Sequence, residues 1–189
     1  AYIVVDEARH LWRDLDNQAM LADSLGAEAE AHHAAGEYEK MTELLHEALS
    51  INEKIENLWG QSYGKVLLHL VHFDRGEADL AIQMANESIT LGDKSGLLAS
   101  SIALRCDLAW AYGCYGAIEK GFAIVEEALS IIQMKNPDWK PISTATMIRL
   151  ALLGGDLHKA EEHVGNAVLQ PISIPYPHYT IVVGLANVE

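Results

Sequence analysis

The side chains best suited to chemistry in this sequence are its histidines, which number nine. His69 and His72 lie three positions apart, with Asp74 close by, and on a helix such residues share one face. That spacing permits metal binding, but a zinc site also needs a third ligand and a second shell of hydrogen bonds. The sequence indicates neither, so we predict no metal site.

Neighbouring carboxylates have the right chemistry for acid–base catalysis but the wrong spacing. Glu126 and Glu127, like Glu161 and Glu162, are adjacent in the chain, so on a helix they point about 100° apart and cannot share a substrate. The glycine-containing stretch 154–156 lacks the preceding strand and the lysine of a phosphate-binding loop. We therefore predict no catalytic residue, no cofactor and no enzymatic activity.

Composition and charge narrow the class of protein. Half of the residues are hydrophobic, which favours a folded chain. The formal net charge is -14, with 18 acidic and 7 basic residues in 1–95 (-11) and 9 and 6 in 96–189 (-3). Such a surface repels phosphate backbones, so we predict no direct nucleic-acid partner. No apolar run reaches the roughly 20 residues of a membrane-spanning helix, and we expect a cytoplasmic protein with no membrane partner.

The two cysteines, Cys106 and Cys114, are eight positions apart. On one helix they would lie about 12 Å from each other, too far for a disulfide bond. We expect both to be reduced core residues.

Four glycines mark an internal repeat, because Gly36, Gly76, Gly116 and Gly155 are 40, 40 and 39 residues apart. Small or apolar residues follow each glycine at offsets +5, +9 and +12, which is one stripe of an amphipathic helix. Glycine tolerates the left-handed conformation that ends a helix, so each glycine should join two helices. The acidic residue after Gly36, Gly76 and Gly155 is then expected in the first turn of the next helix, where the helix dipole favours it.

The repeat predicts paired helices along the whole chain. First helices are expected at roughly 19–34, 57–74, 95–114 and 139–153, and second helices at roughly 37–54, 77–91, 117–134 and 156–169. We divide the single array into a second helix of a truncated repeat (1–16), four repeats (17–56, 57–94, 95–136 and 137–170) and a first helix of another truncated repeat (171–189). Val5–Leu15 and Tyr179–Val188 are the expected end helices, and we expect the natural protein to continue in both directions.

These motifs resemble the tetratricopeptide repeat (TPR), which combines Gly-Asp/Glu-Tyr with an Ala-rich second helix. Gly36-Glu37-Tyr38, Glu47-Ala48-Leu49 and the segment 126–131 match it best, whereas His69 and Ile148 replace the usual small residue. The resemblance implies an all-α, right-handed superhelix of helical hairpins. The long period, with the segments 11–15 and 91–93, is similar to repeats in large multidomain bacterial regulators, which implies a segment of a signalling or transcription regulator.

The resemblance also implies where a partner binds, since the first helices of such an array line a concave wall. Their wall-facing positions, 13, 10, 6 and 3 residues before the turn glycine, include the candidate partner-binding residues Asp23, Glu30, His33, Tyr63, Val66, Leu70, Phe73, Trp110 and Arg149. The apolar and aromatic members suit an apolar or aromatic segment of a peptide, with Asp23 and Glu30 available for a basic group. The same stripe also fits burial between tightly wound helices.

The sequence leaves two functions open. The first is a scaffold that binds a protein, a peptide or another domain of its parent chain, with self-association through the truncated ends. The second is a sensor domain that binds a small molecule or short peptide and regulates an attached output domain.

Overall fold

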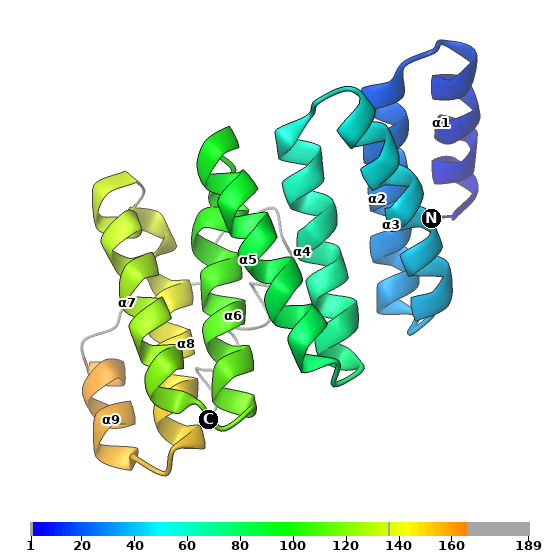
Figure 1. Cartoon of the computed structure of the whole chain (residues 1–189). Coiled ribbons are helices and arrows are strands. Elements are labelled where there is room, and N and C mark those ends of the chain that lie inside the picture. The colour runs from blue at the N-terminus through cyan, green and yellow to red at the C-terminus, as the bar shows by residue number, and fades with distance from the viewer. Residues whose placement is uncertain (1, 136, 166–189) are drawn as a thin grey trace. The chain divides into compact units, whose positions relative to one another are not determined.

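The computed structural model describes residues 2–135 and 137–165, and every regular element within those residues is helical. In chain order (Figure 1) they are α1 (Tyr2–Asp14), α2 (Gln18–Ala34), α3 (Tyr38–Lys54), α4 (Leu58–Asp74), α5 (Ala78–Ser95), the π-helical turn η1 (Ala99–Ala103), α6 (Leu104–Cys114), α7 (Ile118–Lys135), the 3₁₀ turn η2 (Pro137–Trp139), α8 (Lys140–Leu153) and α9 (Leu157–Gly165). The predicted all-α class is confirmed. The helix expected over Tyr179–Val188 lies outside the described residues.

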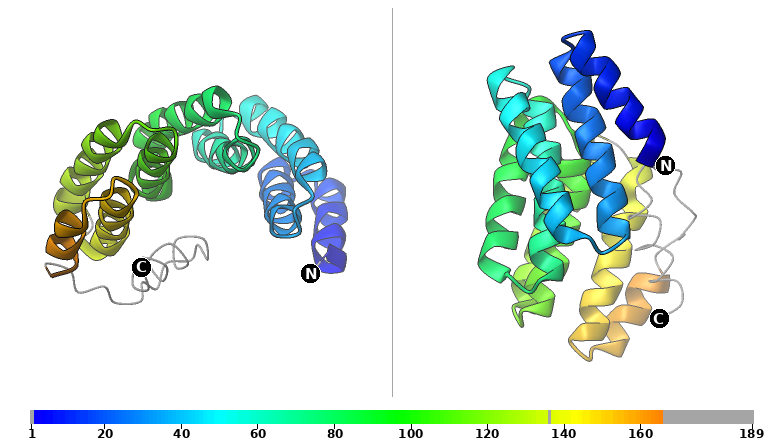
Figure 2. Two further views of the ribbon diagram at one scale, coloured as in Figure 1. Left: turned by 90° about the horizontal axis from the view of Figure 1, so that it is seen from below. Right: turned by 90° about the vertical axis from the view of Figure 1, so that its right-hand side faces the viewer.

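Two compact units divide the chain, Ala1–Ser100 and Ser101–Glu189, called below the N-terminal and C-terminal units. In the N-terminal unit α2 packs on α3 and α4 packs on α5, while α3 contacts α4 and α1 packs on α2. The first helices α2 and α4 form one layer, and α3 and α5 form the other (Figure 2). In the C-terminal unit α6 packs on α7, α8 packs on α9, and α6 contacts α8 directly.

The turns between helices repeat one backbone geometry. A residue with positive φ stands in each of seven turns: Asp16, Gly36, Glu56, Gly76, Gly96, Gly116 and Gly155, with φ between 52° and 85°. The N–H of the next residue donates to the carbonyl five positions earlier at 2.8–3.0 Å, as Glu37 does to His32 and Asn57 does to Asn52. This bond satisfies a carbonyl that the helix end leaves without a partner. The chain therefore reverses about every twenty residues, and the four predicted turn glycines are every second reversal.

The acidic residues after the turn glycines sit one position earlier than expected. Glu37 and Glu77 are N-cap residues rather than first-turn residues, and neither side chain caps the backbone. Instead the ring Nδ1 of His32 lies 2.5 Å from the Glu37 carboxylate, and His72 makes the same contact with Glu77. Each histidine thus ties the end of a first helix to the start of the second, which fixes the hairpin.

Each unit has its own core, built where first and second helices meet. In the N-terminal unit the fully buried side chains include Leu25, Met41, Leu45 and Val71, and in the C-terminal unit Val125, Ile142 and Leu150. The predicted small-residue stripe is buried at Ala48, Ala81, Ala85, Ser88, Ala128 and Ala160. Val164, at the +9 position after Gly155, is an exception with 48% exposure.

The hydroxyls of three buried serines form a hydrogen-bonded group that connects α4, α5 and the turn η1. Ser62 Oγ lies 2.9 Å from the Ser88 carbonyl and 2.6 Å from Ser100 Oγ, and Ser88 Oγ donates to the Ser62 carbonyl at 2.8 Å. Gly92 lies inside α5 and has no room for a side chain, because a Cβ there would lie 2.4 Å from Ser100 Cβ. The helix predicted to end near residue 91 therefore continues to Ser95, and Gly96 supplies the turn.

Candidate interaction faces on the first helices

In the N-terminal unit the predicted wall-facing positions lie on two neighbouring first helices. We call the following residues the α2–α4 face: Asp23, Gly26, Glu30 and His33 of α2, and Trp59, Tyr63, Val66, Leu70 and Phe73 of α4. On α2, Asp23 and Glu30 are exposed and His33 is half-buried. The α2 side of this face is therefore polar and carries negative charge.

The α4 side of the same face is apolar and aromatic. Tyr63, Leu70 and Phe73 are half-buried, whereas Val66 is buried at 6% exposure and belongs to the packed interior. Trp59 continues the row one helical turn before Tyr63 and is 41% exposed, with its ring stacked on Tyr63 at a centroid distance of 5.4 Å. Sequence reasoning missed Trp59, although its spacing of four from Tyr63 places both on one face of a helix.

Four contacts connect α2 and the start of α3 to α4. The Tyr63 hydroxyl donates to the Glu30 carboxylate. The ring of Tyr63 also passes close to Gly26, since a Cβ built on Gly26 would lie 3.8 Å from Tyr63 Cε1. At the turn end, His33 Nε2 lies 2.9 Å from Asp74 Oδ2, and the Tyr38 hydroxyl donates to the same oxygen at 3.1 Å. The structure therefore brings together Glu30 with Tyr63, and adds Asp74 and Tyr38 to the predicted His33.

Burial and neighbouring charge shift two groups at or near this face. Partial burial raises the pKa of the Asp23 carboxyl above its usual 3.8, because water solvates the charged form less well there. The Asp74 carboxylate raises the pKa of Tyr38 from its usual 10.0, mainly through its negative charge and also through the hydrogen bond. The acidic side of the face therefore includes one carboxyl whose charged form is partly desolvated.

The corresponding positions of the C-terminal unit carry different chemistry. At these positions Trp110 of α6 and Arg149 and Leu152 of α8 are half-buried. The remaining positions are buried: Ala103 at the end of η1, Cys106 and Gly113 on α6, and Ile142 and Ala145 on α8. The guanidinium carbon of Arg149 lies 3.8 Å from the centroid of the Trp110 ring, within the range of a cation–π contact. The structure therefore brings together the two predicted residues Trp110 and Arg149.

The histidines considered for chemistry and one of the two cysteines take part in packing. His69 is 1% exposed, with its Nδ1 2.9 Å from the Ala81 carbonyl, and His72 contacts Glu77. Both cysteines are free thiols, and Cys106 is buried as predicted, whereas the prediction of a core position is wrong for Cys114, which is exposed at the last residue of α6. Burial raises the pKa of Cys106 to about 12, and its sulfur lies 3.5 Å from Ser143 Oγ. Among the described residues no three His, Cys, Asp or Glu side chains are grouped as metal ligands.

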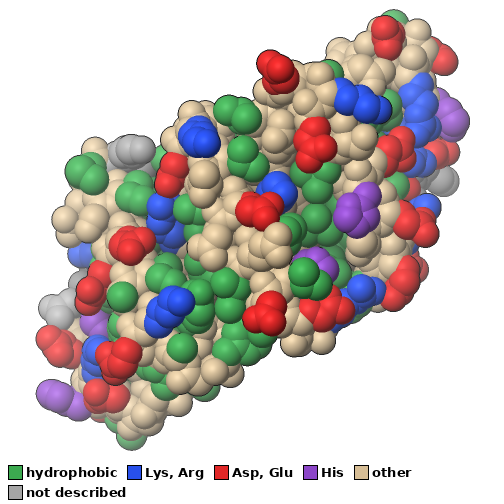
Figure 3. Space-filling model, in the orientation of Figure 1, with side chains coloured by type: hydrophobic (Ala, Val, Ile, Leu, Met, Phe, Trp, Pro, Cys, Tyr) green, Lys and Arg blue, Asp and Glu red, His purple; other side chains and the backbone are tan. Residues whose placement is uncertain are grey.

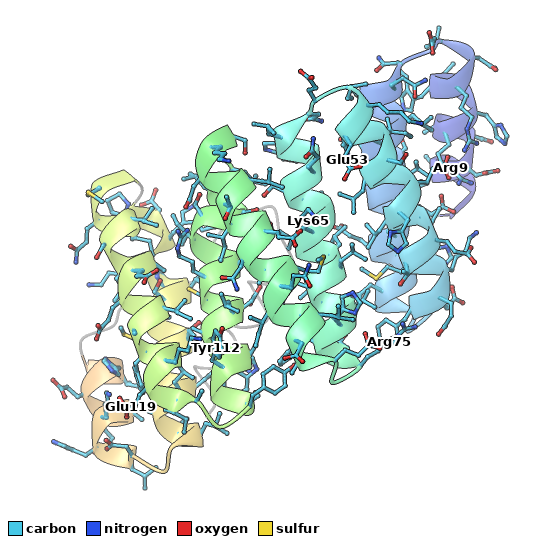
Figure 4. All side chains as sticks on the ribbon, viewed as in Figure 1. Arg9, Glu53, Lys65, Arg75, Tyr112 and Glu119 are labelled. Atoms are coloured by element: carbon cyan, nitrogen blue, oxygen red, sulfur yellow. The ribbon has the colours of Figure 1, made fainter. Side chains whose placement is uncertain are left out.

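The side of the N-terminal unit formed by its second helices carries interspersed acidic, basic and histidine side chains (Figure 3). Several of these charges pair locally. Lys65 reaches from α4 to Glu87 at 2.6 Å, and Arg75 reaches Glu39 at 2.7 Å; both cations are labelled in Figure 4. Exposed pairs of this kind contribute little to stability, and they leave this side without a single dominant charge. None of the described helices has the length and apolar character needed to cross a bilayer.

Comparison with known proteins gives structural relatives at low sequence identity. No family model matches the sequence, and no curated protein matches it. The crystal structure of BtubC (BKLC) from P. vanneervenii superposes with a TM-score of 0.72 at 18% identity, covering 96% of this chain and 78% of that one. A kinesin light chain-like protein of Podosopora anserina with nearly identical TPR-like repeats gives 0.63 at 15% identity, covering 97% and 85%. A variant of the latter gives 0.65 at 16%, covering 86% and 81%.

These likenesses, at identities below one fifth, bear on the fold, and they agree with the helical hairpins and repeated turns described above. The chain therefore has a TPR-like helical-repeat fold, as its turn glycines and helix patterns predict.

Proposed function

We propose that the chain is a non-catalytic scaffold for protein interaction, and that its α2–α4 face binds an apolar or aromatic segment carrying a basic group. The segment belongs to a peptide or to a partner domain. The observation that carries the proposal is the pairing of two unlike rows on one face: Trp59 and Leu70 on α4 beside Asp23 and Glu30 on α2. TPR-like folds generally serve as interaction scaffolds, which supports this class of function.

The apolar row supplies the attachment. Large aromatic side chains that are partly exposed lose the most water-accessible apolar area on binding and dominate many interfaces. Trp59 fits this description, because it is 41% exposed and its ring is oriented by stacking on Tyr63. A preoriented aromatic side chain loses little conformational freedom when a partner packs against it.

The acidic row supplies the selectivity. Asp23 and Glu30 lie on a unit with 18 acidic and 7 basic residues in 1–95, a net charge of -11. Glu30 is held in place by the Tyr63 hydroxyl, and Asp23 is a partly desolvated carboxylate that gains from a cationic neighbour. Such a field attracts basic partners and repels acidic ones, an effect that salt weakens.

A place within a larger bacterial regulator extends the same proposal. It is supported by the long repeat period and by the segments 11–15 and 91–93 that resemble the repeats of such regulators. In that setting the α2–α4 face would also suit a sister domain of the parent chain.

A binding titration with matched variants tests the proposal. Fluorescently labelled 12-residue peptides that combine Leu and Phe with Lys and Arg are titrated by fluorescence polarisation, beside peptides whose basic residues are replaced by Ser. We expect Trp59→Ala and Asp23→Asn each to weaken binding of the basic peptides about tenfold. Leu80→Ala, which removes a similarly exposed apolar side chain from the second helix α5 (44% exposed), should change nothing.

The salt dependence of the same titration separates the two rows. Raising the salt concentration should weaken peptide binding by the wild-type chain more than peptide binding by Asp23→Asn, since that variant has lost part of the electrostatic attraction. Equal binding of the basic and serine peptides, or an effect of Leu80→Ala as large as that of Trp59→Ala, would contradict the proposed site.

A further inference from the structure

The C-terminal unit places a cation in an environment where cations usually have a carboxylate partner. Arg149 of α8 is half-buried, and its guanidinium lies over the indole of Trp110 on the neighbouring helix α6, 3.8 Å from the ring centroid. The two residues belong to the face formed by α6 and α8, whose helices contact each other directly. The pair is therefore fixed by the packing of two helices rather than by a loop.

Within the part of the chain that the structure describes, Arg149 is the arginine that has no acidic partner. Four of the five arginines have a carboxylate within 4.0 Å: Arg9 with Asp6 (2.6 Å), Arg13 with Glu47 (2.9 Å), Arg75 with Glu39 (2.7 Å) and Arg105 with Glu127 (3.9 Å). Arg149 has none among residues 2–135 and 137–165. Its Nε also has no hydrogen-bond acceptor among those residues. The described residues therefore leave the charge of this guanidinium without a carboxylate, and charge-assisted bonds to an incoming carboxylate are strong.

Stacking on the indole prepares the guanidinium to bind a planar anion. A guanidinium lying on an aromatic ring keeps its N–H groups in the plane parallel to that ring, where they can donate two parallel bonds to one carboxylate. The ring also limits the rotamers of the long side chain, so less freedom is lost on binding. A lysine in this position would keep the charge but lose the paired geometry.

The surroundings favour an acidic residue that is flanked by apolar ones. Leu152 is half-buried on the same face, and Ile142 and Ala145 are buried beneath it. The positive charge of Arg149 acts on the nearby Cys114 thiol, although burial outweighs it and raises the pKa of that thiol. Residues 96–189 carry a formal charge of only -3, so an acidic segment meets less repulsion here than at residues 1–95.

We propose that Arg149, oriented by Trp110, is a binding site for an Asp or Glu side chain of a partner protein, flanked in that partner by apolar residues. The site is separate from the α2–α4 face and selects the opposite charge. It rests on the C-terminal unit alone and stands whether or not the N-terminal face binds a basic segment.

A peptide array probed with the full chain tests this site. Nonapeptides carry Glu, Asp, Gln, Lys or phosphoserine at the centre, with Leu or Phe on both sides, and the strongest pairs are titrated in solution by fluorescence polarisation. We expect the Glu and Asp peptides to bind at least about tenfold more tightly than the Gln peptide. Arg149→Gln should remove this preference, and Arg149→Lys should retain only a small part of it.

Two controls separate the site from overall charge and from the fold. Lys140→Gln removes the same charge from an exposed position of the same helix α8 and should leave the preference unchanged. Trp59→Ala, in the N-terminal unit, should also leave it unchanged. Melting followed by circular dichroism checks folding; if Arg149→Gln does not fold, the comparison of wild type with Arg149→Lys decides.

Three results would overturn the proposal. One is equal binding of the Glu and Gln peptides, and another is a preference that survives in Arg149→Gln or that Lys140→Gln removes as well. The third is tighter binding of the phosphoserine peptide than of the Glu peptide, which would assign the site to phosphate.

Discussion

Two helix-interior glycines should respond in opposite directions to the same substitution, alanine. Glycine inside a helix costs about 1 kcal/mol relative to alanine, so Gly→Ala stabilises wherever the added methyl fits. Gly26 of α2 is such a position, because a Cβ there meets only Tyr63 Cε1, at 3.8 Å, an ordinary van der Waals contact. We expect Gly26→Ala to stabilise the chain by about 1 kcal/mol, which raises the melting temperature by about 2–4 °C.

Gly121 of α7 is the contrasting position. A Cβ there would lie 2.6 Å from the Ala109 carbonyl oxygen and 3.1 Å from Leu150 Cδ2. The carbonyl belongs to the backbone of α6 and cannot move without shifting that helix. Overpacking costs about 1–3 kcal/mol, and we take the upper value because the clash is with backbone. Subtracting the gain in helix propensity of about 1 kcal/mol, Gly121→Ala should destabilise the chain by about 2 kcal/mol, which lowers the melting temperature by about 4–8 °C.

Thermal and urea unfolding followed by circular dichroism at 222 nm measure both variants against wild type. The sign of the difference is the test, since both substitutions add the same methyl and gain the same helix propensity. If Gly121→Ala melts at or above the temperature of Gly26→Ala, close packing of α6 on α7 does not explain the glycine, and the argument from helix contact is refuted.

Four further substitutions probe the face, the turns and the buried hydroxyls. Asp23→Asn should raise stability at pH 7, because burial raises the pKa of that carboxyl above its usual 3.8. The gain should shrink as pH falls through the raised pKa and should be absent below 3.8, where the carboxyl is neutral in either state; melts at pH 7 and pH 3 measure this. Gly36→Ala should lower the free energy of unfolding, measured in urea, by about 1–2 kcal/mol. The positive φ of this residue is the only cause, since no atom lies within 4 Å of the new Cβ. Glu56→Gly should conversely raise the free energy of unfolding by up to about 1 kcal/mol, because Glu56 has a φ of 55°, which glycine adopts without strain. Ser62→Ala should lower the free energy of unfolding by about 1–2 kcal/mol by the same method, because it removes the buried hydroxyl that bonds to the Ser88 carbonyl and to Ser100 Oγ.

The hairpins could be predicted from the sequence because glycine is the residue that most readily adopts the positive φ that these turns need. Gly36, Gly76, Gly116 and Gly155 all adopt that conformation. The turns at Asp16 and Glu56 need the same conformation from residues that rarely adopt it, so they carried no such signal. A weaker signal was present in Asn17 and Asn57, which are forty residues apart and both cap the next helix with their side chains.

The positions of the candidate faces were predictable, whereas the pairs within them were not. The repeat frame places Glu30 and Tyr63, or Trp110 and Arg149, on successive first helices. Whether two such side chains meet depends on the offset between neighbouring helices, which is set by contacts such as Gly26 against Tyr63. That offset is a property of packing and has no counterpart in the spacing of residues along one helix.

The position six residues before each turn glycine shows how one backbone can present different chemistry. It holds Glu30, Leu70, Trp110 and Arg149 in successive first helices. All four side chains are exposed or half-buried, while the turn bond that orients each helix uses only backbone atoms. Because the turn bond does not depend on the side chain at this position, the same repeat carries an acidic, aliphatic, aromatic or basic residue there, and Leu70 and Trp110 also pack against the cores of their units. The two proposed binding sites use this position differently, with Glu30 in one unit and Arg149 in the other.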